Sequence, residues 1–130
     1  MSKLKAAEII DLVERHYFRN VDNKNLESLL KCFAEDAVLT VKTASVSHRG
    51  REEGIRNMFS NLNEEIDTIY HGEFRHVVDV ENQCIASEFL VRNTYEDGAQ
   101  VEKSNCNFFE IHNGVFKSVH VYMMGENTLV

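Results

Sequence analysis

The sequence predicts an α+β fold, in which three N-terminal helices pack on one face of a curved, mostly antiparallel sheet. Two observations support this prediction. As far as Leu62, apolar residues recur every three or four positions, which is the period of an amphipathic helix. From Phe74 onward the period changes to two, as in a strand with one buried face. No linker or internal repeat divides the chain, so residues 1–130 are expected to form one domain.

The first helix is predicted over residues 5–21, where apolar side chains follow one another at intervals of four. Tyr17 lies on this stripe, so its ring points inward and its hydroxyl group needs a partner once buried. Asn25 is a good N-cap for a second helix, and Gly50 opens a third. The apolar stripes of these two helices are formed by Leu26, Leu29, Leu30 and Phe33, and by Ile55, Met58, Phe59 and Leu62.

The strands follow from the period-two segments. A corner at residues 34–37 leads into a short strand at 38–41, and residues 43–48 form a second short strand or a loop. An antiparallel meander is predicted from four longer strands. Tight hairpins are favoured by the Asp-Gly pair at 97–98 and the Asn-Gly pair at 113–114. The four strands span residues 74–80, 85–95, 101–112 and 115–124.

The last two strands carry apolar residues on both faces. Phe108, Phe116 and Tyr122 alternate with a second apolar series that contains Phe109 and Val121. The second series is expected to line the core. The outer face, with Phe108, Phe116 and Tyr122, is too apolar for water alone, which predicts a homodimer interface. The alternative is that the chain's own terminus covers this face.

Composition excludes several partners. The net charge is −7 and no cluster of Lys or Arg occurs, which argues against nucleic acid. No apolar run approaches the ~18 residues of a membrane span. The first residues lead into an amphipathic helix rather than a signal peptide, so a cytoplasmic location is expected, with Cys32, Cys84 and Cys106 as reduced thiols. No metal-ligand spacing or glycine-rich phosphate loop is present, so neither a metal nor a cofactor is expected.

Four segments in order resemble the NTF2-like superfamily, in particular its SnoaL-like and ketosteroid-isomerase-like members. These are the first helix pair, the corner at residues 33–38, the helix start Gly50-Arg51-Glu52 and the final hairpin from residue 108 to Tyr122. The resemblance implies a cone-shaped fold with an apolar pocket at one end. This fold hosts isomerases, dehydratases, cyclases, epoxide hydrolases and proteins without catalytic activity, so function has to be argued from the site.

The same resemblance implies roles for several residues. Tyr17 falls on the position of the oxyanion-binding tyrosine of ketosteroid isomerases, and Asn107 on that of their second donor. Val41 falls where those enzymes carry an aspartate general base, so a proton carrier must come from elsewhere. Histidine titrates near neutral pH and is suited to this role. Of the four candidates, His76 ranks first and His48 second, ahead of His71 and His120.

Two functional hypotheses follow. The first is a cofactor-free lyase or isomerase for a small, apolar, oxygenated molecule, with Tyr17, Asn107 and either His76 or His48 as catalytic residues. The second is a non-catalytic ligand-binding or dimerisation module of the same fold, which the valine at position 41 favours. In both cases the expected pocket is lined by Val21, Phe33, Val41, Met58, Phe59, Phe89, Val91, Asn105 and Val121.

Overall fold

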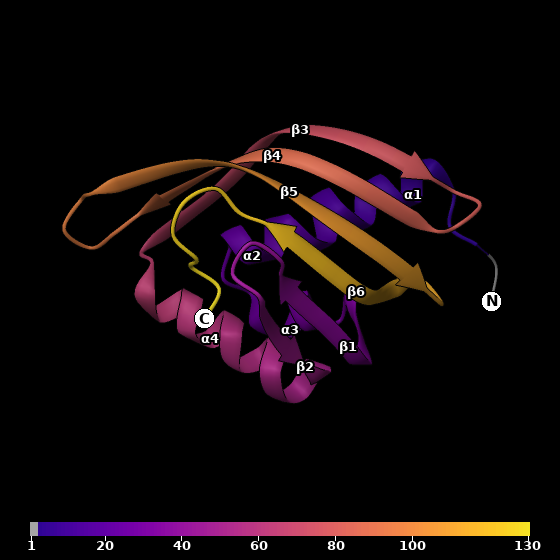
Figure 1. Ribbon diagram of the computed structural model, residues 1–130, viewed down its shortest axis with the longest axis horizontal. Coiled ribbons are helices and arrows are strands. Elements are labelled where there is room, and N and C mark those ends of the chain that lie inside the picture. Colours follow the sequence, from indigo (N-terminus) through magenta and orange to yellow (C-terminus); the bar gives the residue numbers. More distant parts are fainter. Residues whose placement is uncertain (1–2) are drawn as a thin grey trace.

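A computed structural model describes residues 3–130 and shows helices packed on one side of a curved six-stranded sheet (Figure 1). The strand order is β2-β1-β6-β5-β4-β3, and the only parallel pair in this sheet is β1 with β6. The predicted α+β class and mostly antiparallel sheet are therefore confirmed. The strands are β1 (Phe33–Val41), β2 (Val46–Arg49), β3 (Thr68–Asp79), β4 (Cys84–Thr94), β5 (Gln100–His112) and β6 (Val115–Tyr122).

The first helix runs without a break through α1 (Ala6–Asp11), a π-helical stretch η1 (Leu12–Phe18) and α2 (Arg19–Asp22). At the end of η1 the backbone N–H of Arg19 donates to the carbonyl of Glu14, five residues back. A strict interval of four residues drifts around a helix of 3.6 residues per turn, and the wider turn of η1 reduces that drift. The predicted inward stripe is confirmed, because Ile9, Val13, Tyr17 and Val21 are all buried.

The second helix is shorter than its apolar stripe suggested. Helix α3 (Leu26–Leu30) is capped by Asn25, as predicted. The Asn25 side chain accepts a hydrogen bond from the Ser28 backbone N–H at 3.3 Å. The helix ends before Phe33, which instead opens strand β1. The prediction that Phe33 closes the helix stripe is therefore wrong. The predicted corner at residues 34–37 is an irregular part of β1, where the register with β6 shifts.

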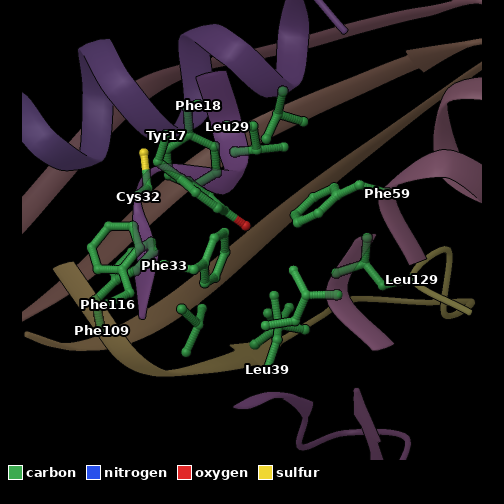
Figure 2. Packing of buried hydrophobic residues seen from close by; sticks show 14 of the residues in the cluster. Tyr17, Phe18, Leu29, Cys32, Phe33, Leu39, Phe59, Phe109, Phe116 and Leu129 are labelled. Atoms are coloured by element: carbon green, nitrogen blue, oxygen red, sulfur yellow. The ribbon is translucent and has the colours of Figure 1, made fainter. Parts of the chain in front are cut away.

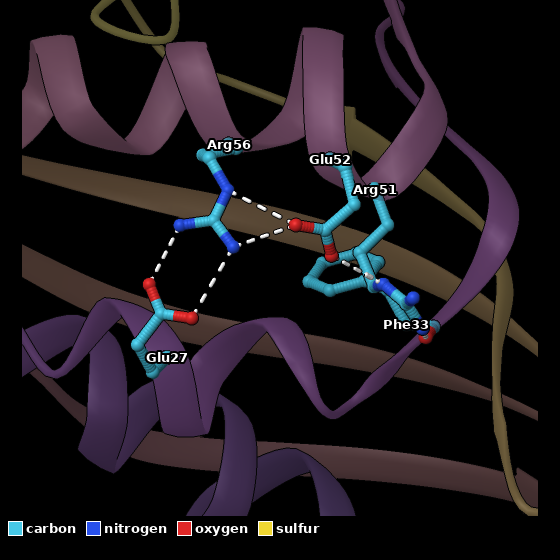
Figure 3. A network of polar contacts seen from close by, with 5 residues as sticks. All are labelled: Glu27, Phe33, Arg51, Glu52 and Arg56. Atoms are coloured by element: carbon cyan, nitrogen blue, oxygen red, sulfur yellow. Dashed lines mark hydrogen bonds and ion pairs between the residues drawn. The ribbon is translucent and has the colours of Figure 1, made fainter.

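The third helix begins at Gly50, as expected, with η2 (Gly50–Ile55), and continues as α4 (Arg56–Glu65). Gly54 allows η2 to approach the end of β2, since a Cβ atom there would lie 2.5 Å from the Arg49 backbone nitrogen. On the exposed side, Arg56 bridges α4 and α3 by donating to both carboxylate oxygens of Glu27, at 2.6 and 3.2 Å (Figure 3). Arg56 also donates to Glu52 at 2.6 Å, and these bonds lower the pKa of both glutamates.

Two irregularities change the predicted faces of the sheet. Strand β3 starts at Thr68, six residues before the predicted strand, and a bulge between Gly72 and Arg75 shifts its pairing with β4. A second register shift, between Glu110 and Ile111, turns Phe116 toward the core, where it is fully buried. The placement of Phe116 on the outer face was therefore wrong.

An aromatic cluster joins the helices to the sheet (Figure 2). The Tyr17 ring lies edge-on to its neighbours, with centroid distances of 4.7 Å to Phe18, 5.4 Å to Phe109 and 5.6 Å to Phe116. Such edge-to-face pairs add to the stability that burial provides. The cluster therefore fixes the Tyr17 ring at the centre of the core.

Candidate functional site

An internal cavity of about 40 Å³ lies between the first helix, α4 and the concave face of β3–β6. Its apolar wall includes Phe18, Phe59 and Phe89, and its polar wall includes Asn93, Asn105 and Asn107. A cavity of this volume holds roughly three water molecules. Pockets for small organic ligands usually measure ~300 Å³ or more, so a ligand must displace part of the wall.

The polar wall contains groups without protein partners. Asn107 Oδ1 is buried and makes no hydrogen bond within residues 3–130. Neither the Tyr17 hydroxyl nor the side-chain amide of Asn93 is hydrogen-bonded in this part of the chain, although both residues are buried and line the cavity. Figure 2 shows the Tyr17 oxygen pointing toward the space between Phe33 and Phe59. Burial raises the pKa of Tyr17 well above its ordinary value, so the hydroxyl group stays protonated and can donate a hydrogen bond.

A histidine–carboxylate pair stands beside these groups. His71, on β3, has its Nδ1 2.5 Å from Asp22 Oδ1, and its backbone N–H donates to Asp22 Oδ2 at 3.0 Å. The imidazole lies against the rings of Phe18 and Phe89, with centroid distances of 4.6 and 5.4 Å. Since a carboxylate only accepts hydrogen bonds, Nδ1 carries the proton in the neutral ring. Nε2, which has no partner among the described residues, is then free to accept a proton.

Residues 123–130 close the other end of the cavity. After β6 this segment folds back and ends beside α4 (Figure 1). Its backbone is held by side chains of the body: Met124 N–H donates to Asn105 Oδ1 at 3.0 Å, and the Leu129 carbonyl lies 2.9 Å from His48 Nε2. Met123, Thr128 and Leu129 line the cavity, so this segment occupies its mouth.

The predicted site residues divide into two groups. Tyr17 and Asn107 line the cavity, as do six of the predicted pocket residues: Val21, Phe59, Phe89, Val91, Asn105 and Val121. The other three, Phe33, Val41 and Met58, are buried in the core but do not line it.

Both histidines that ranked highest lie outside the cavity. His76 bonds to Glu14 Oε2 at 2.6 Å and to Ser87 Oγ at 2.8 Å, further along β3. His48 contacts the backbone of residue Leu129. The imidazole that does reach the cavity, His71, was a lower-ranked candidate, and its partner Asp22 was not identified. The only sequence signal for this pair was a carboxylate at the end of the predicted helix and a histidine just before the predicted strand.

Within residues 3–130 no group of three His, Cys, Asp or Glu side chains is placed to hold a metal ion. All three cysteines are free thiols. No helix in this described range is long and apolar enough to cross a membrane.

Helices packed against a curved sheet, with a small cavity between them, define an NTF2-like fold. The chain belongs to the SnoaL-like domain family, whose pattern matches residues 13–119. No curated protein matches the sequence.

Solved structures share the fold at low sequence identity. A hypothetical protein with a ketosteroid isomerase-like fold from Catenulispora acidiphila is 12% identical over 92% of this chain and 88% of its own, with a TM-score of 0.77. An LEH-like epoxide hydrolase from M. tuberculosis is 14% identical, with coverage of 91% and 84% and a TM-score of 0.76. An NTF2-like protein of unknown function from Burkholderia pseudomallei is 13% identical, with coverage of 95% and 92% and a TM-score of 0.76.

Proposed function

We propose that this protein is a cofactor-free lyase or isomerase for a small, apolar, oxygenated substrate, with His71 as its proton carrier. One observation carries the proposal: His71, whose Nε2 has no partner among the described residues, lines the same cavity as Asn107, whose buried Oδ1 is also without a partner there. Buried polar groups normally find partners, so groups left without one in a cavity favour a bound polar ligand. The ketosteroid isomerase-like and epoxide hydrolase relatives share the fold, which is consistent with this class of reaction.

The proposed reaction begins with proton transfer. His71 Nε2 removes a proton from the carbon next to a substrate carbonyl, and Asp22 stabilises the resulting imidazolium. The Tyr17 hydroxyl and the Asn107 amide N–H donate to the oxygen on which negative charge develops. The imidazolium then returns its proton either to another carbon, which is isomerisation, or to a departing hydroxyl group, which leaves as water.

Enolisation of model ketones tests this proposal. The assay follows deuterium incorporation into 2-indanone and 2-tetralone in D₂O by NMR, with the wild-type protein expected to accelerate exchange. His71→Gln should lower this rate by roughly 10²- to 10⁴-fold, which is the usual contribution of a positioned base. His76→Gln is the matched control, because His76 is also on β3 and also bonds to a carboxylate of the first helix, Glu14, but lies outside the cavity.

Two results would contradict the proposal: a wild-type protein that leaves the exchange rate of both ketones unchanged, or a His71→Gln variant as active as His76→Gln. The valine at position 41, where ketosteroid isomerases carry their general base, favours the alternative, a non-catalytic ligand-binding module. In that case both ketones would raise the thermal stability of the protein without exchanging faster than in buffer.

We also propose that the protein forms a homodimer through the outer face of its sheet. Tyr122 and Met124 are 44% and 52% exposed, and Phe108 on the neighbouring strand is half-buried. An exposed apolar patch of this kind is typical of an interaction surface.

A further inference from the structure

Lys103 is the only buried charged residue within residues 3–130, with 4% of its surface exposed. It lies on β5, two residues from Asn105 and on the same inward face, and it pairs with Val91 on β4. Both of these neighbours line the cavity. Lys103 itself is not part of the lining, but it lies directly beside this part of the cavity wall.

The ammonium group of Lys103 has a single hydrogen bond, to the backbone carbonyl of Glu126. An ammonium group has three donors, and no carboxylate lies within ion-pairing distance of this one in the described residues. Burial lowers the pKa of Lys103, opposed by the nearby charge of Glu126. A buried cation that bonds to a neutral acceptor alone is costly, and an anion in the same place would stabilise it.

The carbonyl that occupies this position belongs to residues 123–130, the segment after β6. Met123, Thr128 and Leu129 line the internal cavity, Glu126, Asn127, Thr128 and Val130 line an outer groove of about 420 Å³, and Thr128 is therefore common to both. Displacement of this segment would join the two spaces into a volume suited to an organic ligand. It would also withdraw the Glu126 carbonyl and leave Lys103 facing the combined site.

We propose that Lys103 binds a carboxylate of the ligand at the mouth of the cavity, in the place that the Glu126 carbonyl occupies in this structure. The inference rests on the ligand site proposed above and narrows its substrate class to an oxo acid. Asn107 lies four residues along β5 from Lys103, a distance of roughly 13 Å along the strand. The oxygen held by Asn107 and the carboxylate held by Lys103 would thus lie at opposite ends of the ligand.

The acidic character of the protein acts against this interaction only weakly. The net charge is −7, and Glu64, Glu65 and Glu126 line the outer groove. All three side chains are exposed to solvent, where salt at physiological concentration screens charges over ~8 Å. The buried ammonium group of Lys103 would contact the ligand carboxylate directly, in surroundings that screen charges far less than water does. This attraction therefore outweighs the repulsion from the exposed glutamates.

A pair of probes of equal shape tests the inference. The dissociation constants of 2-naphthoate and 2-naphthamide are measured by calorimetry on the full chain. Wild-type protein should bind the carboxylate about tenfold tighter or more, as expected for hydrogen bonds to a charged group. Lys103→Met should reduce this acid-to-amide ratio to near one, whereas Lys117→Met, which removes an exposed lysine of β6, should leave it unchanged.

The ratio, rather than either affinity, is the deciding quantity, because loss of the bond to Glu126 could loosen the segment and affect both probes equally. A wild-type ratio near one would overturn the inference even if Lys103→Met failed to fold. A ratio that persists in folded Lys103→Met would also overturn it. If the amide binds and only the selectivity is missing, the ligand site stands without its carboxylate anchor. If neither probe binds, the ligand site and the anchor both fail.

Discussion

Asn107 is expected to destabilise the folded protein, and its replacement by an apolar residue is expected to raise the free energy of unfolding. Its Oδ1 is buried without a partner in the described residues, and Asn107 as a whole is 3% exposed. Mutational data place the cost of an unpartnered buried polar group at about 1–3 kcal/mol. Leucine has a similar shape and no polar atom, so Asn107→Leu should raise the free energy of unfolding by about this amount. For a chain of this length that corresponds to roughly 4–12 °C in Tm.

Asn105→Leu is the matched control for this measurement. Asn105 lies two residues away on the same face, but its Oδ1 accepts a hydrogen bond from the Met124 N–H at 3.0 Å. This variant should therefore lose about 0.5–1.5 kcal/mol, because it removes a partly buried hydrogen bond. Urea unfolding of both variants, monitored by circular dichroism, measures whether each substitution raises or lowers the free energy of unfolding. A destabilised Asn107→Leu would refute the reasoning, since it would assign Asn107 a structural bond and remove it from the ligand site.

Two further predictions concern the surface. Arg56 lowers the pKa of Glu27 and Glu52 below their ordinary value of 4.5, so the stability that it contributes is present above that pH and is lost as pH falls through the lowered values. In urea titrations the advantage of wild type over Arg56→Gln should thus shrink on acidification below pH 4.5, and a constant difference would exclude the linkage. For the homodimer, sedimentation should give twice the chain mass of 15.0 kDa at micromolar concentration, and Tyr122→Glu should shift it toward the monomer. A wild-type protein that sediments as a monomer would contradict the proposed homodimer.

Regular periodicity made most of the fold predictable. The inward stripe of the first helix and the antiparallel meander of the last four strands follow from spacing, and the predicted pocket residues Asn105 and Asn107 do line the cavity. The prediction of inward and outward faces failed at bulges, because one extra residue exchanges the two faces of a strand. Because of the bulge between Gly72 and Arg75, the period-two pattern of β3 was recognised only from residue 74 onward, and the irregularity beside Ile111 placed Phe116 on the opposite face.

The candidate site was harder to predict because its parts are brought together by tertiary contacts. Asp22 and His71 are separated by 49 positions, and no local pattern connects a helix end with the first residues of a strand. His71 also lies on the part of β3 that the bulge concealed. The segment after Tyr122 has no periodicity, so no pattern predicted that Leu129 would line a cavity.

Because Leu129 and its neighbours occupy part of the proposed ligand site, residues 123–130 would compete with a ligand for that site. In the proposed mode of binding, a ligand binds only to molecules in which residues 123–130 have moved aside, so the measured dissociation constant would equal the intrinsic one divided by the open fraction. If roughly one molecule in a hundred is open, the apparent affinity is about a hundredfold weaker than the contacts alone would give. Affinity can therefore be adjusted at residues that touch no ligand. A change at Thr43, whose hydroxyl accepts from the Met123 N–H at 3.2 Å, would alter the open fraction and leave the walls of the site untouched.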